Sequence, residues 1–305
     1  MKKKYKVIAE LLLIILIFSL FYKFMNLSYS FTYLANANFG YFIIAIVIAF
    51  GTRFVNASRF YLLAGSIGVH LGYKKNLMVH FLTGFLGRFT PARVGEGSKV
   101  MLLEGDKQKI GFLFILEKIV DLITLVIISV IAIFTFSMYG SIGIKLMIFL
   151  GFFTIALVLL FHIEKIINLV MKRAVLEKQW FYKNLKSIPK KAFVIFLFNS
   201  LAIRFLVLSI PFLVAIALDI RISYWLIFQM YAVSIIAGWL SGLPGGMGTR
   251  EVAYSFLLMA YSITKELAGI AAILVILVDL LVESVLAIAG YLALKVGRKS
   301  LPLNN

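Results

Sequence analysis

The chain has 305 residues, of which 62% are hydrophobic and only 14% are charged, and its mean hydropathy is +1.02. A soluble domain carries about 25% charged residues, so the composition excludes an ordinary water-soluble enzyme and a nucleic-acid-binding module. The formal net charge is +18. The basic residues lie mostly between apolar runs, which indicates membrane orientation and contact with anionic lipid headgroups rather than nucleic acid.

Six apolar runs are predicted to cross the membrane, whose hydrocarbon core is about 30 Å thick. They are 7–22, 41–63, 111–138, 142–163, 192–217 and 266–294. The first run has the alternative of a signal peptide, because Ala35-Asn36-Ala37 resembles a cleavage site. That triplet lies too far beyond the run, and the chain after it is itself apolar, which favours an uncleaved span. Residues 1–305 are therefore expected to form a single all-α polytopic membrane domain.

Two further apolar stretches, 77–105 and 222–264, are interrupted by the segments GRFTPARVGEG and SGLPGGMGTRE. Gly and Pro break a helix, and non-helical backbone at membrane depth survives only where protein or water surrounds it. Each stretch is therefore predicted to form a helix–break–helix hairpin that could be re-entrant. The alternative is a pair of short cytoplasmic loops.

The charge distribution predicts the orientation of the chain. With the N-terminus inside and each broken stretch returning to its starting side, the cytoplasmic segments carry 20 Lys and Arg and the outer loops carry four. The cytoplasmic segments are 1–6, 59–76, 104–110, 164–191 and 295–305. Positive residues are enriched on the cytoplasmic side, so both termini and the basic loop 164–191 are predicted to face the cytoplasm of the cell membrane.

The two broken stretches resemble each other. In each, Pro, Gly and Glu follow an aromatic-Leu-small-Gly start, and a later span carries Val-Asp-Leu with Asp121 or Asp279. Under the predicted topology the copies, 41–163 and 192–294, run in opposite directions across the membrane. Inverted repeats with broken helices are a recurrent transporter architecture, although chance similarity between apolar segments is the alternative.

Thirteen ionisable residues are predicted at or near membrane depth, where each would cost about 2.5–3.5 kcal/mol or more if it faced lipid. They must therefore pair with each other or line a wet cavity, although any single one could simply tie two helices together. The bases are Arg53, Arg88, Arg93, Lys99, Lys118, Arg204 and Arg250, and the acids are Glu96, Glu117, Asp121, Glu251, Asp279 and Glu283.

Part of this set is expected to form a buried charge network, namely Arg53, Glu117, Lys118, Asp121, Arg204, Asp279 and Glu283. Glu117 with Asp121, and Asp279 with Glu283, are pairs spaced i, i+4, so each pair shares one helix face. Bases must lie opposite two like charges on one face. We expect the acids to offset the arginines when no lipid is bound and thereby to gate transport, with simple locking of helix contacts as the alternative.

The helices that begin after Pro91 and Pro244 are predicted to bind an anion. They would present free backbone N–H groups and a positive dipole end beside several arginines, and glycine lets a ligand approach the backbone closely. A phospholipid phosphate suits a cavity that opens to lipid, and an inorganic anion would satisfy the same chemistry. The predicted substrate-binding residues are Arg88, Arg93, Glu96, Gly245, Gly246, Gly248, Arg250 and Glu251.

The pattern PARVGEG…EKIVDLI, followed by LPGGMGTRE…LVDLLVE, resembles the flippase-like membrane region of lysylphosphatidylglycerol synthases over about residues 10 to 295. Arg93 and Glu96 match the first motif, and Gly245, Gly246, Gly248 and Glu251 match the second. Lys118 stands where the family often has Arg. Members with synthase activity carry a soluble C-terminal domain that transfers an amino acid from tRNA to a lipid, and the family also has short stand-alone members. The resemblance implies a chain of the second kind, which translocates lipid without the transferase.

We therefore expect a flippase-like transporter that moves a phospholipid or lipid-linked substrate, with anionic phospholipid or a polyprenyl-phosphate-linked substrate as its partner and a homo-oligomer as an open option. The alternatives are a lipid-modifying enzyme of the phosphatidylglycerol lysyltransferase type, an ion-coupled solute transporter and an assembly partner without transport activity. There is no cysteine and no Walker motif, and no embedded Ser-His set is evident. No catalytic residue, metal or cofactor is therefore expected, and His70, His80 and His162 are expected to be structural.

Overall fold

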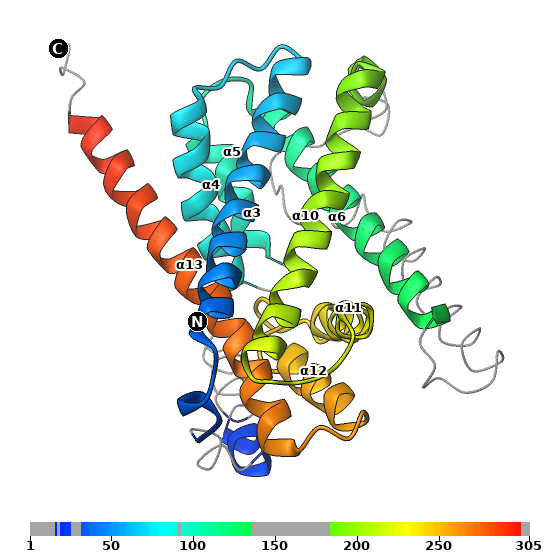
Figure 1. The fold of residues 1–305 in the computed structure, drawn as a ribbon. Helices are drawn as coiled ribbons and strands as arrows, with labels where there is room; N and C mark the ends of the chain where they lie inside the picture. Colours follow the sequence, from blue (N-terminus) through cyan, green and yellow to red (C-terminus); the bar gives the residue numbers. More distant parts are fainter. Residues whose placement is uncertain (1–15, 17–18, 26–31, 91–92, 136–183, 300–305) are drawn as a thin grey trace. The chain divides into compact units, whose positions relative to one another are not determined.

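A computed structural model describes residues 16, 19–25, 32–90, 93–135 and 184–299 (Figure 1). All regular elements in this part of the chain are helices, as the composition predicted. The predicted span 142–163, most of the span 7–22 and most of the basic loop 164–191 lie outside the described residues. The count of six spans therefore stays a prediction.

The described helices follow one another in the order expected for two broken stretches set among long helices. They are α3 (Phe39–Ser66), α4 (Tyr73–Arg88), the 3-10 helix η1 (Val94–Ser98), α5 (Lys99–Leu102), α6 (Lys107–Thr135), α10 (Lys190–Ala217), α11 (Tyr224–Leu240), α12 (Thr249–Met259) and α13 (Lys265–Lys299).

Three of these helices are long and apolar enough to cross a membrane. They are α3, α10 and residues Lys265–Lys295 of α13, which cover the predicted spans 41–63, 192–217 and 266–294. Helix α6 covers most of the predicted span 111–138 with 29 residues. Because 20 helical residues rise about 30 Å, each of these elements can cross the hydrocarbon core.

The chain folds into two compact units, which are described separately. Unit 1 takes its residues from the chain up to Phe50, from Gly87–Arg93 and from Leu206–Val282. Unit 2 takes its residues from Gly51–Leu86, from Val94–Phe205 and from Glu283 onward.

In unit 2 the first broken stretch returns to its starting point. Lys75, at the start of α4, donates a hydrogen bond to Glu104, which lies two residues after the end of α5. The Nζ of Lys109 lies 3.2 Å from the backbone oxygen of Ile67 and ties the start of α6 to the end of α3. The Lys75 ammonium lowers the pKa of the exposed Glu104 carboxyl by hydrogen bonding and charge. The two ends of the stretch therefore meet, as a hairpin requires.

An apolar core lies around this hairpin in unit 2. Phe60 and Leu63 of α3 pack in it with Val79 of α4 and with Phe112 and Leu113 of α6, and all five side chains are buried. Burial of a side chain of this size contributes about 1.5–3 kcal/mol. The core therefore holds α3, α4 and α6 in fixed register around the charged groups described below.

The first break differs from the prediction. The residues after it form the five-residue 3-10 helix η1 and the four-residue α5, rather than one continuous helix. A 3-10 helix is used in short pieces because its hydrogen-bond geometry is poorer. The expected anion-binding helix terminus after Pro91 is therefore absent from the described residues at this break.

The second break, in unit 1, is followed by a regular helix. Helices α11 and α12 pack against each other across the break, and Figure 1 shows them side by side. At the break, an added Cβ on Gly246 would lie 2.9 Å from the backbone of Gly238 in α11. Gly246 also has a φ of +70°, which L side chains rarely adopt. The close approach of the two backbones thus requires glycine at position 246. At this point the broken stretch folds back on itself.

Candidate functional site

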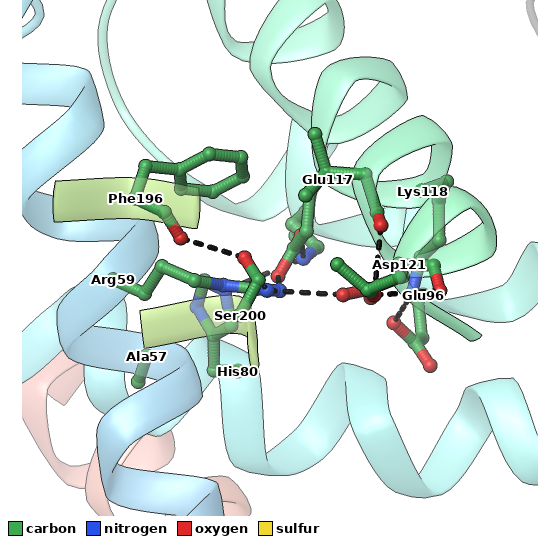
Figure 2. Close-up of polar contacts among 12 residues, drawn as sticks. Ala57, Arg59, His80, Glu96, Glu117, Lys118, Asp121, Phe196 and Ser200 are labelled. Atoms are coloured by element: carbon green, nitrogen blue, oxygen red, sulfur yellow. Dashed lines mark hydrogen bonds and ion pairs between the residues drawn. The ribbon is translucent and has the colours of Figure 1, made fainter. Parts of the chain in front are cut away.

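An arginine from α3 is the centre of a buried ionic cluster in unit 2 (Figure 2). The Nη2 of Arg59 lies 2.9 Å from Oε1 of Glu117, and its Nη1 lies 3.0 Å from Oδ1 of Asp121. The same Nη1 donates to Oγ of Ser200 at 2.7 Å. Only 2% of Arg59 is exposed. Glu117 and Asp121 lie one turn apart on α6, so one planar guanidinium can bind both carboxylates.

Helix α10 lines one side of this cluster with Phe196 and Ser200. The guanidinium carbon of Arg59 lies 5.0 Å from the ring centroid of Phe196. One turn further along α10, the Ser200 hydroxyl donates to the backbone oxygen of Phe196 at 2.7 Å and thereby turns its lone pairs toward Arg59. The cluster therefore joins α3, α6 and α10 through one arginine.

A second base shares Glu117. The Nζ of Lys99 lies 2.6 Å from Oε2 of Glu117 and 3.3 Å from Nε2 of His80. It also lies 4.8 Å from the ring centroid of Phe60. Lys99 and Glu117 are 1% and 3% exposed. Each oxygen of the Glu117 carboxylate thus has its own cationic partner.

The rim of the cluster is also ionic. Arg204 of α10 donates to the backbone oxygen of Asp121 at 3.0 Å, and the same nitrogen lies 3.7 Å from its carboxylate. Lys118 donates to Glu96 in η1. We call the set Arg59, His80, Glu96, Lys99, Glu117, Lys118, Asp121, Ser200 and Arg204 the Arg59 cluster.

The central residue of this cluster was not among those selected from the sequence. Arg59 stood in the predicted cytoplasmic segment 59–76 and was left out of the expected charge network, whereas in the structure α3 continues to Ser66 and Arg59 is buried. The apolar run that follows it, FYLLAG, was a usable signal that the span continues. Bases were expected opposite both i, i+4 acid pairs, and the structure places Arg204 beside Asp121, Arg53 beside Glu283 and Arg88 beside Asp279.

Unit 1 holds a second group of buried charges. The Nη2 of Arg88 lies 3.4 Å from Oδ2 of Asp279, and the Nη1 of Arg250 lies 3.9 Å from the same oxygen. Arg250 also places Nε and Nη2 3.0 Å from Oε1 of Glu251. We call Arg88, Arg250, Glu251 and Asp279 the Arg250 cluster. All but the partly buried Arg250 are buried in the fold.

The start of α12 belongs to the same cluster. The backbone N–H of Gly248 donates to Oε2 of Glu251 at 2.7 Å, so this carboxylate caps the helix that follows the break. Gly245 approaches Arg88 closely, since an added Cβ would lie 2.7 Å from its backbone oxygen. The predicted anion position at this helix end is thus taken by a carboxylate of the chain itself.

Two tyrosines that were not among the predicted residues lie beside Arg250. Its guanidinium carbon lies 5.7 Å from the ring centroid of Tyr231, and that ring meets Tyr254 edge-on with centroids 5.3 Å apart. Among the described residues, the buried hydroxyl of Tyr254 has no hydrogen-bond partner. Aromatic faces attract a guanidinium, so Tyr231 helps to hold Arg250 in place.

The other predicted residues have the following positions. Arg53 binds Glu283 at 2.9 Å in unit 2. Arg93 lies in the first break with a φ of +57°. Glu96 was predicted to bind substrate, and it joins Lys118 in the Arg59 cluster. Of the predicted binding residues, the structure brings together Arg88, Gly245, Gly246, Gly248, Arg250 and Glu251.

Comparison with known protein families identifies one whose profile covers most of the chain. The sequence profile of the family described as lysylphosphatidylglycerol synthase TM region matches residues 7–287, which include every member of both clusters. No curated protein sequence matches the chain significantly. A match over nearly the whole chain, with apolar helices and both motifs inside it, shows that this protein belongs to the lysylphosphatidylglycerol synthase TM region family.

Proposed function

We propose that this protein is a flippase-like transporter that moves an anionic phospholipid or a polyprenyl-phosphate-linked substrate across the cell membrane. The family and the apolar helices support a membrane location and a role connected with lipids. The Arg250 cluster is the phosphate site in this proposal.

The observation that carries the proposal is the way two arginines share one carboxylate oxygen. Arg88 and Arg250 approach Oδ2 of Asp279 at 3.4 and 3.9 Å, both longer than the 2.7–2.9 Å of a good charge-assisted hydrogen bond. A phosphate has more acceptor oxygens than Asp279 offers to these guanidinium groups. Exchange of Asp279 for a lipid phosphate would therefore shorten both contacts.

The exchange also supplies a mechanism for moving the substrate. Asp279 and Glu251 balance the two arginines while the site is empty, which avoids unpaired buried bases. An entering phosphate competes for the same bases and thereby favours a second arrangement of the broken hairpin. In this proposal the hairpins are re-entrant, and the two halves form the inverted repeat from which alternating access arises.

Reconstitution of the purified protein into liposomes tests the proposal. Fluorescent phosphatidylglycerol and a fluorescent polyprenyl phosphate serve as probes, and chemical quenching from outside reports transfer between leaflets. Hydrogen bonds to charged groups contribute about 1.5–3 kcal/mol, so Arg250→Ala should slow transfer about 10- to 150-fold per folded molecule. Arg250→Lys should restore it only in part, because Lys cannot bind phosphate in a bidentate way.

The matched control is Arg221→Ala, since Arg221 is an exposed arginine beside Asp219 outside the cluster. It should transfer lipid at the wild-type rate. Normal transfer of both probes by an Arg88→Ala, Arg250→Ala double variant would refute the phosphate site. Absence of transfer by the wild-type protein with both probes would refute the transport function.

A further inference from the structure

The hydrogen bonds around His80 define which ring nitrogen carries the proton. Its Nδ1 lies 3.0 Å from the backbone oxygen of Asn76, one turn earlier in α4. A carbonyl oxygen can only accept, so Nδ1 is the donor. The Nε2 of the neutral ring therefore carries a lone pair, and it accepts a hydrogen bond from the Lys99 ammonium at 3.3 Å.

The charges of the Arg59 cluster around this pair come from five elements. Arg59 lies on α3, Glu96 on η1, Lys99 on α5, Glu117, Lys118 and Asp121 on α6, and Arg204 on α10. Helix α13 also packs against α4, since an added Cβ on Gly290 would lie 2.7 Å from the Met78 backbone oxygen, and its acid Glu283 is bound to Arg53. Phe60 of α3 covers the ring of His80 with centroids 4.9 Å apart. With His80 neutral, the Arg59 cluster holds four bases and three acids.

The excess of one positive charge opposes uptake of a further cation unless a base of the cluster gives up its present contact. A metal cation would need free carboxylate oxygens, but both Glu117 oxygens and Oδ1 of Asp121 already bind Arg or Lys. The lone pair on Nε2 of His80 is a base that a proton can use without displacing a carboxylate contact. His80 is partly exposed, as are Lys118, Asp121 and Arg204, whereas Lys99 and Glu117 are buried. Of the partly exposed members, His80 is the one that can take up a proton without losing an ion pair.

We propose that His80 and Lys99 form a proton-binding switch that couples proton uptake to the transport proposed above, on which this coupling rests. A proton from bulk water binds Nε2 of His80 and adds one positive charge to the cluster. Nε2 then becomes a donor, and two cationic donors cannot share the 3.3 Å contact. The Lys99–His80 hydrogen bond therefore breaks.

The consequence is a change in how the first hairpin is tied together. Lys99 remains bound to Glu117 on α6, while His80 on α4 loses its contact with α5. The pair is thus a two-state link between the two arms of the hairpin, one state with the proton and one without it. A transporter needs such a bistable element to convert ion binding into movement.

A spectroscopic titration tests the switch without reference to transport. Protein labelled with ¹⁵N at histidine and lysine is titrated in detergent by NMR between pH 4 and 8, and His80→Gln assigns the His80 signals among the three histidines. We expect the neutral Nδ1–H tautomer at pH 8, and one transition in which the signals of His80 and of the Lys99 ammonium change with the same midpoint. An Nε2–H tautomer, a His80 signal without a transition, or an unresponsive Lys99 would overturn the switch.

A transport measurement tests the coupling. Lipid transfer is followed in liposomes with an imposed pH gradient and a clamped membrane potential. If one proton moves with each lipid, the equilibrium ratio of lipid between leaflets changes about tenfold per pH unit of gradient. His80→Gln should abolish this dependence, because Gln can still accept from Lys99 but cannot be protonated. His70→Gln is the matched control, since His70 is exposed, and it should keep the dependence.

The two experiments separate failure of the switch from failure of the proposed function. Lipid transfer by the wild type that ignores the gradient overturns the coupling, and so does a His80→Gln protein that still responds to it. If the wild type transfers no lipid, the transport proposal fails, and the NMR titration by itself confirms or overturns the proton site.

Discussion

At the scale of single residues, the guanidinium of Arg59 connects three helices, although no sequence motif pointed to it. Arg59 binds Glu117, Asp121 and Ser200 from a position that is 2% exposed. Arginine suits this task because its planar fork presents several donors in fixed directions. Removal of one partner of a buried ion pair is strongly destabilising, since it leaves an uncompensated buried charge.

We expect Arg59→Ala to lower the free energy of unfolding by about 3–5 kcal/mol. Arg59→Lys should recover only part of this loss, because one ammonium cannot bind both carboxylates in the geometry of the fork. The free energy is measured by denaturant unfolding in mixed detergent micelles. Arg221→Ala is the control and should stay within about 0.5 kcal/mol of wild type. An Arg59→Ala protein as stable as the control would contradict the central role of Arg59.

The buried contacts of Glu117 also change the expectation for its role. The sequence suggested gating by Glu117 and Asp121, but Glu117 binds Arg59 and Lys99 with both oxygens. The substitution Glu117→Gln would remove the negative charge that Arg59 and Lys99 share. The structure thus supports a stabilising lock at Glu117 and moves the candidate for a switch to the neighbouring His80.

At the scale of helices, the second broken stretch depends on close backbone packing. The break passes α11 so closely that an added Cβ on Gly246 would lie 2.9 Å from the Gly238 backbone. Two separate costs oppose a side chain there, namely the lack of space and the positive φ.

We expect Gly246→Ala to destabilise the protein by about 1–3 kcal/mol more than Gly242→Ala. Gly242 also has a positive φ, of +66°, but no atom lies within 4 Å of its added Cβ, so it isolates the conformational cost from the steric one. Thermal melting in detergent gives the comparison. Equal melting temperatures for the two variants would show that the break does not pack on α11 as described.

At the scale of the whole molecule, the orientation in the membrane remains a prediction from the charge distribution. The absence of native cysteine allows single-cysteine labelling in intact cells. Lys74→Cys and Lys186→Cys, at exposed positions in predicted cytoplasmic segments, should react with a membrane-impermeant thiol reagent only after the cells are opened. Arg221→Cys, in a predicted outer loop, should react in intact cells. Labelling of a cysteine at position 186 in intact cells would contradict the predicted orientation and indicate the opposite one.

The class of protein, the family and the positions of the breaks could all be predicted from the residue order alone. Span length, apolar composition and the Gly and Pro interruptions are local properties, so they can be read without knowledge of packing. For the same reason α3, α10 and α13 lie where their apolar runs predicted. The motif residues Arg250 and Glu251 are adjacent in the chain, and their contact follows from that local position.

Which charges contact each other depends on how the helices pack, and it could not be predicted from the residue order. Arg59 lies 58 residues from Glu117 and 62 from Asp121, so their contact depends on how α3 packs against α6. The positive-inside count could not detect this, because it treats an arginine near the end of a span as a cytoplasmic residue. In the low-dielectric interior, two carboxylates on one buried helix face require a base opposite them, and a count of loop charges does not register that requirement. The packing of α3 against α6 places Arg59 opposite these carboxylates, and the order of residues in the chain does not show this.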